Sequence, residues 1–288
     1  MKLDKLGVLV ECFGLGLRGG VERAAKLGLK CVQISVGGGE AAPDNLTAAQ
    51  RRDLLAFVKD KGMVISSLCG DIGGHGLMRA EENEYRFEIH KKQADLAAEL
   101  ECAVITTHIG IIPPEPAHPR YDVLLEACSR IGAYALKNGV RLAIETGPEP
   151  STVLLGFLEN ISDGSVGVNM DPANLVMVTG DDPVAAVRRL KGRILHTHVK
   201  DGKLLSYQGA EKVYTFFAEG GIGDVRMEDC FLETPLGQGS VDFPAYFRAL
   251  REIGYDGWNA IERECGDDPA LDIELAMGYL ASLDMDAR

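Results

Sequence analysis

The chain has 288 residues, with 30 Lys and Arg side chains against 43 Asp and Glu, so its formal charge at pH 7 is −13. This charge disfavours nucleic-acid binding, which depends on cationic side chains that neutralise phosphates, and favours small polar molecules as partners. A hydrophobic content of 46% and a charged content of 25% exclude disordered and collagen-like classes and indicate a globular chain with a large core.

Short apolar runs alternate along the chain with longer segments of helical periodicity. The runs predicted to be strands are 6–11, 31–36, 63–69, 103–108, 140–145, 166–171, 194–199 and 257–262. Helices are predicted between them, among others over 47–61, 81–100, 121–137 and 270–280. Several helical segments end at a glycine just before the next run, as at Gly28 and Gly62, which is typical of helix C-termini.

Eight alternating units of this kind require parallel strands joined by crossovers, and eight is the number that closes a barrel with helices outside. We therefore predict an α/β fold, a single (β/α)8 TIM barrel domain spanning 1–288. An open doubly wound sheet is the alternative, but the glycines after the first run do not form a G-x-G-x-x-G fingerprint. The connection 200–241 is too long for an ordinary loop, so we expect it to lie over the barrel mouth.

The cysteines and the apolar runs bear on the cellular compartment. Seven cysteines are scattered without a C-x-x-C pair, which indicates buried reduced thiols rather than disulfides or a cysteine zinc site. The apolar stretch 6–17 is interrupted by Glu11 and makes a poor signal peptide, and the chain holds no run of 18 apolar residues. We therefore expect a cytoplasmic protein without a membrane partner.

The last four predicted strands each end on a side chain that can bind a metal: Glu145, Asp171, His198 and Glu262. The carboxyl ends of barrel strands meet at one mouth, so we expect these side chains to converge. Each carboxylate could instead cap the following helix, but three clustered carboxylates would repel one another without a cation. We predict one divalent ion, with Mn²⁺ favoured by the oxygen-rich set and Mg²⁺, Co²⁺ or Zn²⁺ as alternatives.

Further polar residues near the strand ends are candidate substrate contacts. His196 shares a strand face with His198 but lies deeper, so it is either a hydrogen-bonded interior histidine or a substrate contact. Lys200 could form a Schiff base, but Asp201 beside it favours a salt-bridged lysine or one that binds a substrate hydroxyl. Three more residues are expected to line the mouth and contact substrate: Glu11, His75 and His108.

Five motifs in the second half of the chain carry a family resemblance. They are Ile144-Glu145, Met170-Asp171-Pro172-Ala173-Asn174, His196-Thr197-His198-Val199-Lys200-Asp201, Leu236-Gly237-Gln238-Gly239-Ser240-Val241-Asp242 and Ala260-Ile261-Glu262-Arg263-Glu264. With them the chain resembles the xylose-isomerase-like barrel superfamily, which includes sugar phosphate isomerases and epimerases, ketose 3-epimerases, keto-inositol dehydratases and class IV apurinic endonucleases. The resemblance to ketose 3-epimerases implies that Glu145, Asp171, His198 and Glu262 hold one divalent ion and that the two glutamates also move the proton.

The chain departs from the epimerases at two positions that bind substrate in that family. Asn174 stands where the resemblance leads one to expect a histidine, and Leu204 stands where it leads one to expect an arginine. Asn174 is therefore a candidate substrate contact, while the identity of the substrate does not carry over from the family.

The predicted function is a divalent-metal-dependent isomerase or 3-epimerase that acts on a free or phosphorylated ketose or keto-sugar, with Glu145 and Glu262 as the acid–base pair. A metal-dependent lyase that dehydrates a keto-inositol is the alternative, because its opening step is the same proton abstraction. An apurinic endonuclease is disfavoured by the charge and because the segment 223–227 lacks its additional ligands. A sugar sensor without catalysis is a further alternative. Barrels of this family commonly associate, so a homo-oligomer is expected.

Overall fold

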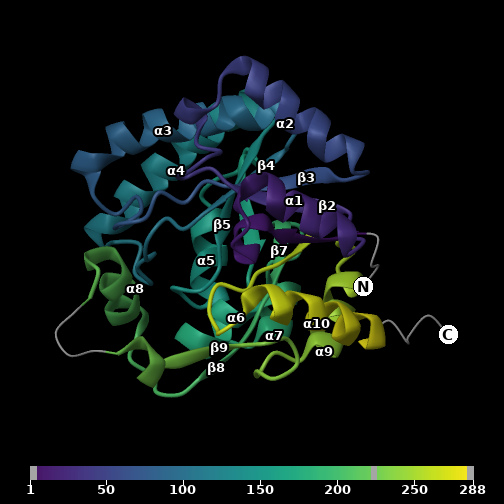
Figure 1. The fold of residues 1–288 in the computed structure, drawn as a ribbon. Helices are drawn as coiled ribbons and strands as arrows, with labels where there is room; N and C mark the ends of the chain where they lie inside the picture. The colour runs from purple at the N-terminus through teal and green to yellow at the C-terminus, as the bar shows by residue number, and fades with distance from the viewer. Residues whose placement is uncertain (1–4, 222–225, 284–288) are drawn as a thin grey trace.

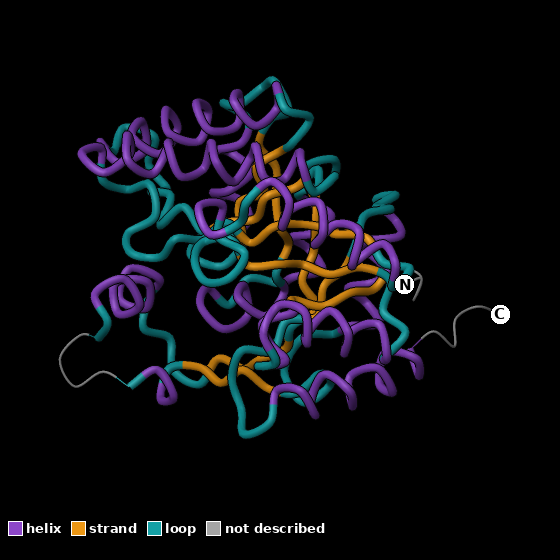
Figure 2. The backbone as a smooth tube through the Cα atoms, turned by 45° about the horizontal axis from the view of Figure 1, so that its top comes forward, coloured by secondary structure: helices purple, strands orange, loops and turns teal. Residues whose placement is uncertain are grey.

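Eight parallel strands form a closed barrel in the computed structural model, which describes residues 5–221 and 226–283. The barrel order is β1-β10-β7-β6-β5-β4-β3-β2, and β1 closes it by pairing with both β10 and β2. Figure 2 shows these strands surrounded by helices. The barrel strands are β1 (Leu6–Leu9), β2 (Cys31–Ser35), β3 (Val64–Cys69), β4 (Val104–Thr107), β5 (Arg141–Glu145), β6 (Val166–Met170), β7 (Ile194–Val199) and β10 (Asn259–Ile261). Each of the eight predicted runs contains one of them, so the predicted TIM barrel is confirmed.

Helices connect the strands and cover the outside of the barrel (Figure 1). They are α1 (Gly16–Lys26), α2 (Ala48–Asp60), α3 (Ala80–Glu99), α4 (Pro119–Lys137), α5 (Ser151–Leu158), α6 (Pro172–Asn174), α7 (Pro183–Arg189), α9 (Phe243–Glu252) and α10 (Pro269–Leu283). Local sequence sets where they begin: Thr47 and Gln50 form a reciprocal capping box at α2, and the Asp242 side chain accepts a hydrogen bond from Ala245 N at α9. No helix within the described ranges combines the length and apolar character that crossing a bilayer requires.

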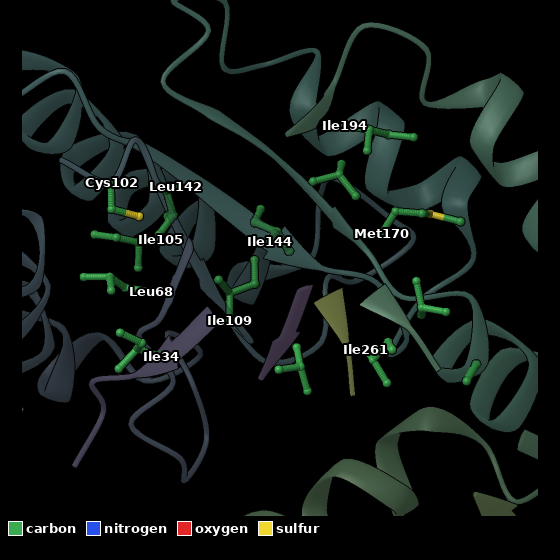
Figure 3. Packing of buried hydrophobic residues seen from close by; sticks show 14 of the residues in the cluster. Ile34, Leu68, Cys102, Ile105, Ile109, Leu142, Ile144, Met170, Ile194 and Ile261 are labelled. Carbon is green, nitrogen blue, oxygen red and sulfur yellow. The ribbon is translucent and has the colours of Figure 1, made fainter. Parts of the chain in front are cut away.

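The hydrophobic core lies between the strands and these helices. Side chains alternate along a strand, so Ile34 faces away from its neighbour Gln33, and Ile144 faces away from Glu145. Figure 3 shows Ile34 and Ile144 among the buried apolar side chains of this layer, together with Leu68, Ile105 and Leu142. The other face of the same strands is therefore left to fill the barrel interior, where the polar side chains gather.

The segment predicted as a loop over 200–241 carries its own secondary structure. Strands β8 (Asp201–Leu204) and β9 (Phe231–Thr234) pair antiparallel. Helix α8 (Ala210–Glu219) comes between them in the chain and lies at the left of Figure 1. The expectation of a loop was wrong because strand pairing between distant residues leaves little trace in local sequence. We refer to the segment 200–241 as the excursion. Its residues 222–225, and with them most of the segment 223–227, lie outside the described residues.

Asp201 holds the two ends of the excursion together. Its carboxylate accepts hydrogen bonds from the backbone N–H groups of Gly202, Gly237, Gly239 and Val241, at 2.9 to 3.1 Å. Gly239 approaches so closely that a Cβ atom there would lie 2.0 Å from Asp201 Oδ1, so only glycine fits.

The cysteines are all free thiols. Burial was expected for every one of them, and Cys265 is the clear exception because it lies exposed in the loop that follows β10.

Candidate metal centre and substrate site

Four side chains from neighbouring strands meet at the carboxyl end of the barrel. Glu145 ends β5, Asp171 follows β6, His198 lies near the end of β7 and Glu262 follows β10. One ligand atom from each lies within 4.8 Å of the others, and none of the four residues is more than 7% exposed. The structure thus brings together all four predicted ligands in a buried cluster that could hold a metal ion.

The cluster is arranged around the Nδ1 atom of His198. This nitrogen lies 3.1 Å from Glu262 Oε2, 3.3 Å from Asp171 Oδ2 and 3.4 Å from Glu145 Oε1. A single N–H group cannot satisfy three carboxylates at once, whereas a divalent cation can accept all of these donors. Three oxygen donors and one imidazole nitrogen are a ligand set suited to such an ion, so the residues present fit the predicted cofactor.

The opposite nitrogen of His198 fixes the tautomer that metal binding needs. Its Nε2 atom lies 2.9 Å from Gln33 Oε1, which can only accept a hydrogen bond. Gln33 in turn donates from Nε2 to Thr106 Oγ1 at 2.9 Å, which holds the amide in this orientation. His198 therefore donates from Nε2, and the lone pair of Nδ1 in the neutral ring faces the carboxylates.

Asp171 is placed for both roles that its sequence position suggested. It is the N-cap of α6: its Oδ1 atom accepts a hydrogen bond from Asn174 N at 2.9 Å, while its Oδ2 atom faces His198. Helix capping and ion binding were stated as alternatives for this carboxylate. In the structure one oxygen caps the helix, while the other faces the ligand cluster.

Charge compensation without an ion comes from nearby cations. Burial raises the pKa of Glu145, but the charges of His198 and His108 outweigh it and hold the pKa below its usual value. Burial also acts against the charged form of Glu262, yet His198 and Lys200 keep its pKa well below the usual range. Conversely, desolvation lowers the pKa of His198, but Glu262 and Glu145 raise it well above normal. A proton on His198 therefore occupies the electrostatic role that a bound cation would take over.

Lys200 lies against the same cluster within a cage of carboxylates. Its Nζ atom lies 2.7 Å from Glu264 Oε2, 2.9 Å from Glu262 Oε2 and 3.5 Å from Glu233 Oε2. Desolvation lowers the pKa of Lys200, but the negative charges around it raise the pKa well above normal. These contacts agree with a salt-bridged lysine, although its partners are these glutamates and not the neighbouring Asp201, which accepts backbone hydrogen bonds. A lysine held in its charged form by carboxylates is a poor nucleophile, which disfavours the Schiff-base role.

Asn174 and His108 lie beside Glu145, on the side that faces the excursion. Asn174 Nδ2 donates to Glu145 Oε1 at 3.1 Å, and His108 Nε2 lies 3.6 Å from the same oxygen. The His108 ring meets the Tyr214 ring of α8 edge to face at 5.7 Å. A Cβ atom at Gly147, whose φ is +148°, would lie 2.8 Å from both the Tyr214 hydroxyl and Asn174 Cβ. Gly147, Tyr214 and Asn174 therefore pack together beside Glu145.

Three other candidate substrate contacts lie away from the cluster. His196 is fully buried and hydrogen-bonded inside the barrel, which contradicts a substrate contact and agrees with the interior alternative. β1 ends at Leu9, so Glu11 does not end a strand but lies in the 3-10 turn that follows, and it is exposed. His75 Nε2 instead contacts Glu219 Oε1 of α8 at 2.6 Å, which ties the excursion to the loop after β3.

Several residues of the site escaped sequence reasoning. Gln33 and Asn169 interrupt the apolar residues of their strands, and that interruption was the available signal. Tyr214 and Glu233 belong to the excursion, where no local pattern connects them to the barrel mouth.

Known proteins share both sequence and fold with this chain. It is 27% identical over 155 residues to inosose dehydratase from Geobacillus thermodenitrificans (strain NG80-2), which covers 52% of this chain and 49% of that one. The chain thus spans about half the length of the curated relatives it matches. A xylose isomerase domain protein from Planctomyces limnophilus has a similar structure, with a TM-score of 0.79 and 26% identity over 97% of this chain and 96% of that one.

A D-tagatose 3-epimerase-like protein shares the fold, with a TM-score of 0.72 and 20% identity over 99% of this chain and 100% of that one. The family model described as xylose isomerase-like TIM barrel matches residues 21–283. The chain therefore belongs to the xylose isomerase-like TIM barrel family.

Proposed function

We propose that this protein is a divalent-metal-dependent enzyme that isomerises or epimerises an uncharged keto-sugar by moving a proton between Glu145 and Glu262. The observation that carries the proposal is the meeting of three buried carboxylates and one imidazole within 4.8 Å. Mn²⁺ is the favoured ion because the set is rich in oxygen and contains a single nitrogen. When bound, such an ion supplies Lewis-acid stabilisation of negative charge on a substrate oxygen.

The two glutamates support proton transfer from two sides. Along the barrel, β5, β6, β7 and β10 are neighbours in that order, so Glu145 and Glu262 come from the two outer strands of the set. Their lowered pKa values keep both carboxylates ionised and able to accept a proton at neutral pH. If one glutamate removes a proton and the other returns one to the opposite face, the carbon is epimerised; return to the adjacent carbon gives isomerisation.

The charges around the mouth favour an uncharged substrate. Lys200 is surrounded by three carboxylates, and Arg263 pairs with Glu233 and Asp272, both at 2.8 Å. A phosphoryl group would have to displace carboxylates from these cations, at a cost in desolvation and repulsion. Hydroxyl groups, in contrast, can bind to Asn174, His108 and Tyr214 without such competition.

Dehydration of a keto-inositol is the second candidate, and the relatives named inosose dehydratase favour it. The opening proton abstraction by a glutamate is the same in both reactions. The dehydratase then needs an acid that donates a proton to the departing hydroxyl. His108 suits that role, because its pKa is raised by Glu145 and Asp71 despite the opposing effect of burial.

The test is turnover in deuterated water. Protein stripped of metal by a chelator and reloaded with Mn²⁺ is incubated with ketohexoses and a keto-inositol, and products are followed by NMR. Deuterium at an inverted or newly reduced carbon supports the isomerase or epimerase, while an unsaturated water-loss product supports the dehydratase. Metal-loaded protein that gives neither product contradicts both, and Glu145→Gln is the control that should abolish label incorporation.

A further inference from the structure

A chain of hydrogen bonds runs from the barrel interior up to Glu145. His196 lies two residues before His198 on β7, is fully buried and is not used by the proposed reaction. Its Nδ1 atom lies 2.9 Å from Asn169 Oδ1, and Asn169 Nδ2 lies 3.0 Å from Glu145 Oε2. Asn169 thus stands between an imidazole below it and a ligand carboxylate above it.

The direction of each bond follows from which groups can donate. An ionised carboxylate only accepts, so the Asn169 amide must turn its NH₂ group toward Glu145 and its oxygen toward His196. His196 must then donate from Nδ1, which leaves Nε2 as an acceptor. Ser66 Oγ and Ser67 Oγ both lie 3.2 Å from that Nε2 atom. Ser66 Oγ donates its hydrogen to Val32 O at 3.2 Å, so Ser67 Oγ is the donor to His196.

The opposite orientation of the Asn169 amide would place its oxygen against Glu145. Two acceptors would then face each other in a buried site, which costs the hydrogen bond and adds repulsion. Asn169 Nδ2 also lies 3.2 Å from His198 Nε2, but that nitrogen already donates to Gln33. Glu145 selects one orientation of the Asn169 amide, and a donor on His196 Nδ1 stabilises the same orientation from the other side. Without that donor, the buried Asn169 Oδ1 atom loses its hydrogen bond to the imidazole and the amide is held at one end only.

We infer that His196 is a positioning residue, which orients Asn169 so that its amide donates to Glu145 and presents that carboxylate to the metal ion. The inference rests on the proposed function for the role of Glu145. His196 makes no hydrogen bond to the carboxylates of the cluster; its ring lies edge to face against the ring of His198 at 5.9 Å, and its hydrogen bond toward the cluster runs through Asn169.

The experiment compares metal binding by His196→Leu, which removes the donor, with His196→Asn, whose amide can donate from the position of Nδ1. Mn²⁺ is titrated into metal-free protein by calorimetry, and the visible spectrum of the Co²⁺-loaded protein reports ligand geometry. Loss of a residue that orients a metal ligand costs about 10- to 100-fold in metal affinity, so His196→Leu should lose that much. His196→Asn should recover most of the affinity and the Co²⁺ spectrum of the wild type.

The matched control is His90→Leu. His90 is also buried, but it hydrogen-bonds to Gln93 on the same helix α3 at 2.8 Å, away from the cluster. This control should lose stability without a change in metal affinity or spectrum. A similar loss of affinity in His90→Leu would show a general effect of destabilisation and overturn the inference.

The remaining outcomes separate the inference from the proposed function. Wild-type affinity and an unchanged Co²⁺ spectrum in His196→Leu overturn the inference and leave the metal site standing. Wild-type protein that binds neither Mn²⁺ nor Co²⁺ overturns both. Wild-type protein that binds Mn²⁺ but turns over no keto-sugar overturns the reaction only, and the affinities of the two variants still decide the role of His196.

Discussion

The two halves of the barrel contribute different chemistry to one site. The ligand half (β5, β6, β7 and β10) ends in Glu145, Asp171, His198 and Glu262, whereas the neutral half (β1, β2, β3 and β4) has no charged residue or histidine in any strand. The neutral half instead supplies Gln33 and Thr106 to His198, and Ser67 to His196. The difference teaches that the charged side chains that could bind an ion lie on one side of the site, while uncharged hydrogen-bonding groups on the other side hold the imidazoles in place.

The largest effect is expected from removing a charge in the ligand half. Glu262→Gln keeps the shape of the side chain but loses the ligand charge and the proton acceptor. Because general acid–base groups contribute about 10²- to 10⁴-fold, kcat for the proposed keto-sugar substrate should fall by on the order of 10³. Steady-state kinetics with saturating Mn²⁺ measures the loss.

Glu264→Gln is the matched comparison for this variant. Glu264 contacts the same lysine, but its side chain is 57% exposed and it stands outside the ligand cluster. Its replacement should cost far less than the replacement of Glu262. Equal losses in the two variants would contradict a special role for the ligand half.

The stability of the protein should depend on pH through Glu149, a carboxyl group that follows β5 of the ligand half and is not one of the ligands. Burial raises the pKa of Glu149 from 4.5 to about 8, and its Oε1 atom lacks a hydrogen-bond partner within the described structure. The folded protein therefore keeps this proton where the unfolded chain releases it, so stability should fall as pH rises from about 4.5 to about 8. The loss is on the order of a few kcal/mol, since one pKa unit corresponds to about 1.4 kcal/mol.

Glu149→Gln removes this ionisation. Urea unfolding at pH 5 and pH 9 should show that the variant gains stability relative to the wild type at the higher pH. A difference between the two proteins that is the same at both pH values would contradict the assignment.

The neutral half is tested by Gln33→Leu. This change leaves His198 Nε2 without its acceptor, so the ring loses the contact that fixes its tautomer. Mn²⁺ affinity, measured by calorimetry, should weaken by about 10- to 100-fold. Gln93→Leu is the control, because Gln93 is equally buried and makes two hydrogen bonds, to His90 and to Gly70 O. If both variants bind Mn²⁺ alike, the neutral half does not orient His198.

The smallest effect is expected where the excursion touches the neutral half. Glu219 of α8 pairs with His75 and, at 3.5 Å, with Arg79, and its side chain is 52% exposed. Exposed ion pairs are worth about 0–1 kcal/mol, so Glu219→Gln should lower the free energy of unfolding by less than about 1 kcal/mol. The difference should shrink in 1 M salt because of screening. A loss that persists at high salt would point to packing of α8 instead.

Sequence periodicity predicted the barrel and the ligand half well for one physical reason. Parallel strands buried on both faces are continuous apolar runs, and a charged residue at the end of such a run is conspicuous. Glu145, Asp171 and Glu262 stand out in this way, and period two separates His198 from the deeper His196.

The neutral half and the excursion could not be predicted in the same way. Gln33 lies in the middle of a mostly apolar strand, and its sequence position does not tell which imidazole across the barrel it meets. Tyr214 and Glu233 reach the mouth through pairing of β8 with β9, which joins residues about thirty positions apart. Contacts of that kind depend on the closed fold and leave no local periodicity.

The gathering of the excursion's two ends by Asp201 has an evolutionary consequence. Because one carboxylate fixes where the excursion leaves and rejoins the barrel, the residues between these two points can be exchanged as a unit. Its length and side chains can diverge, or be replaced by grafting, without moving the strands beneath. Substrate preference can therefore drift in such a protein while the chemistry at the floor of the site stays constant.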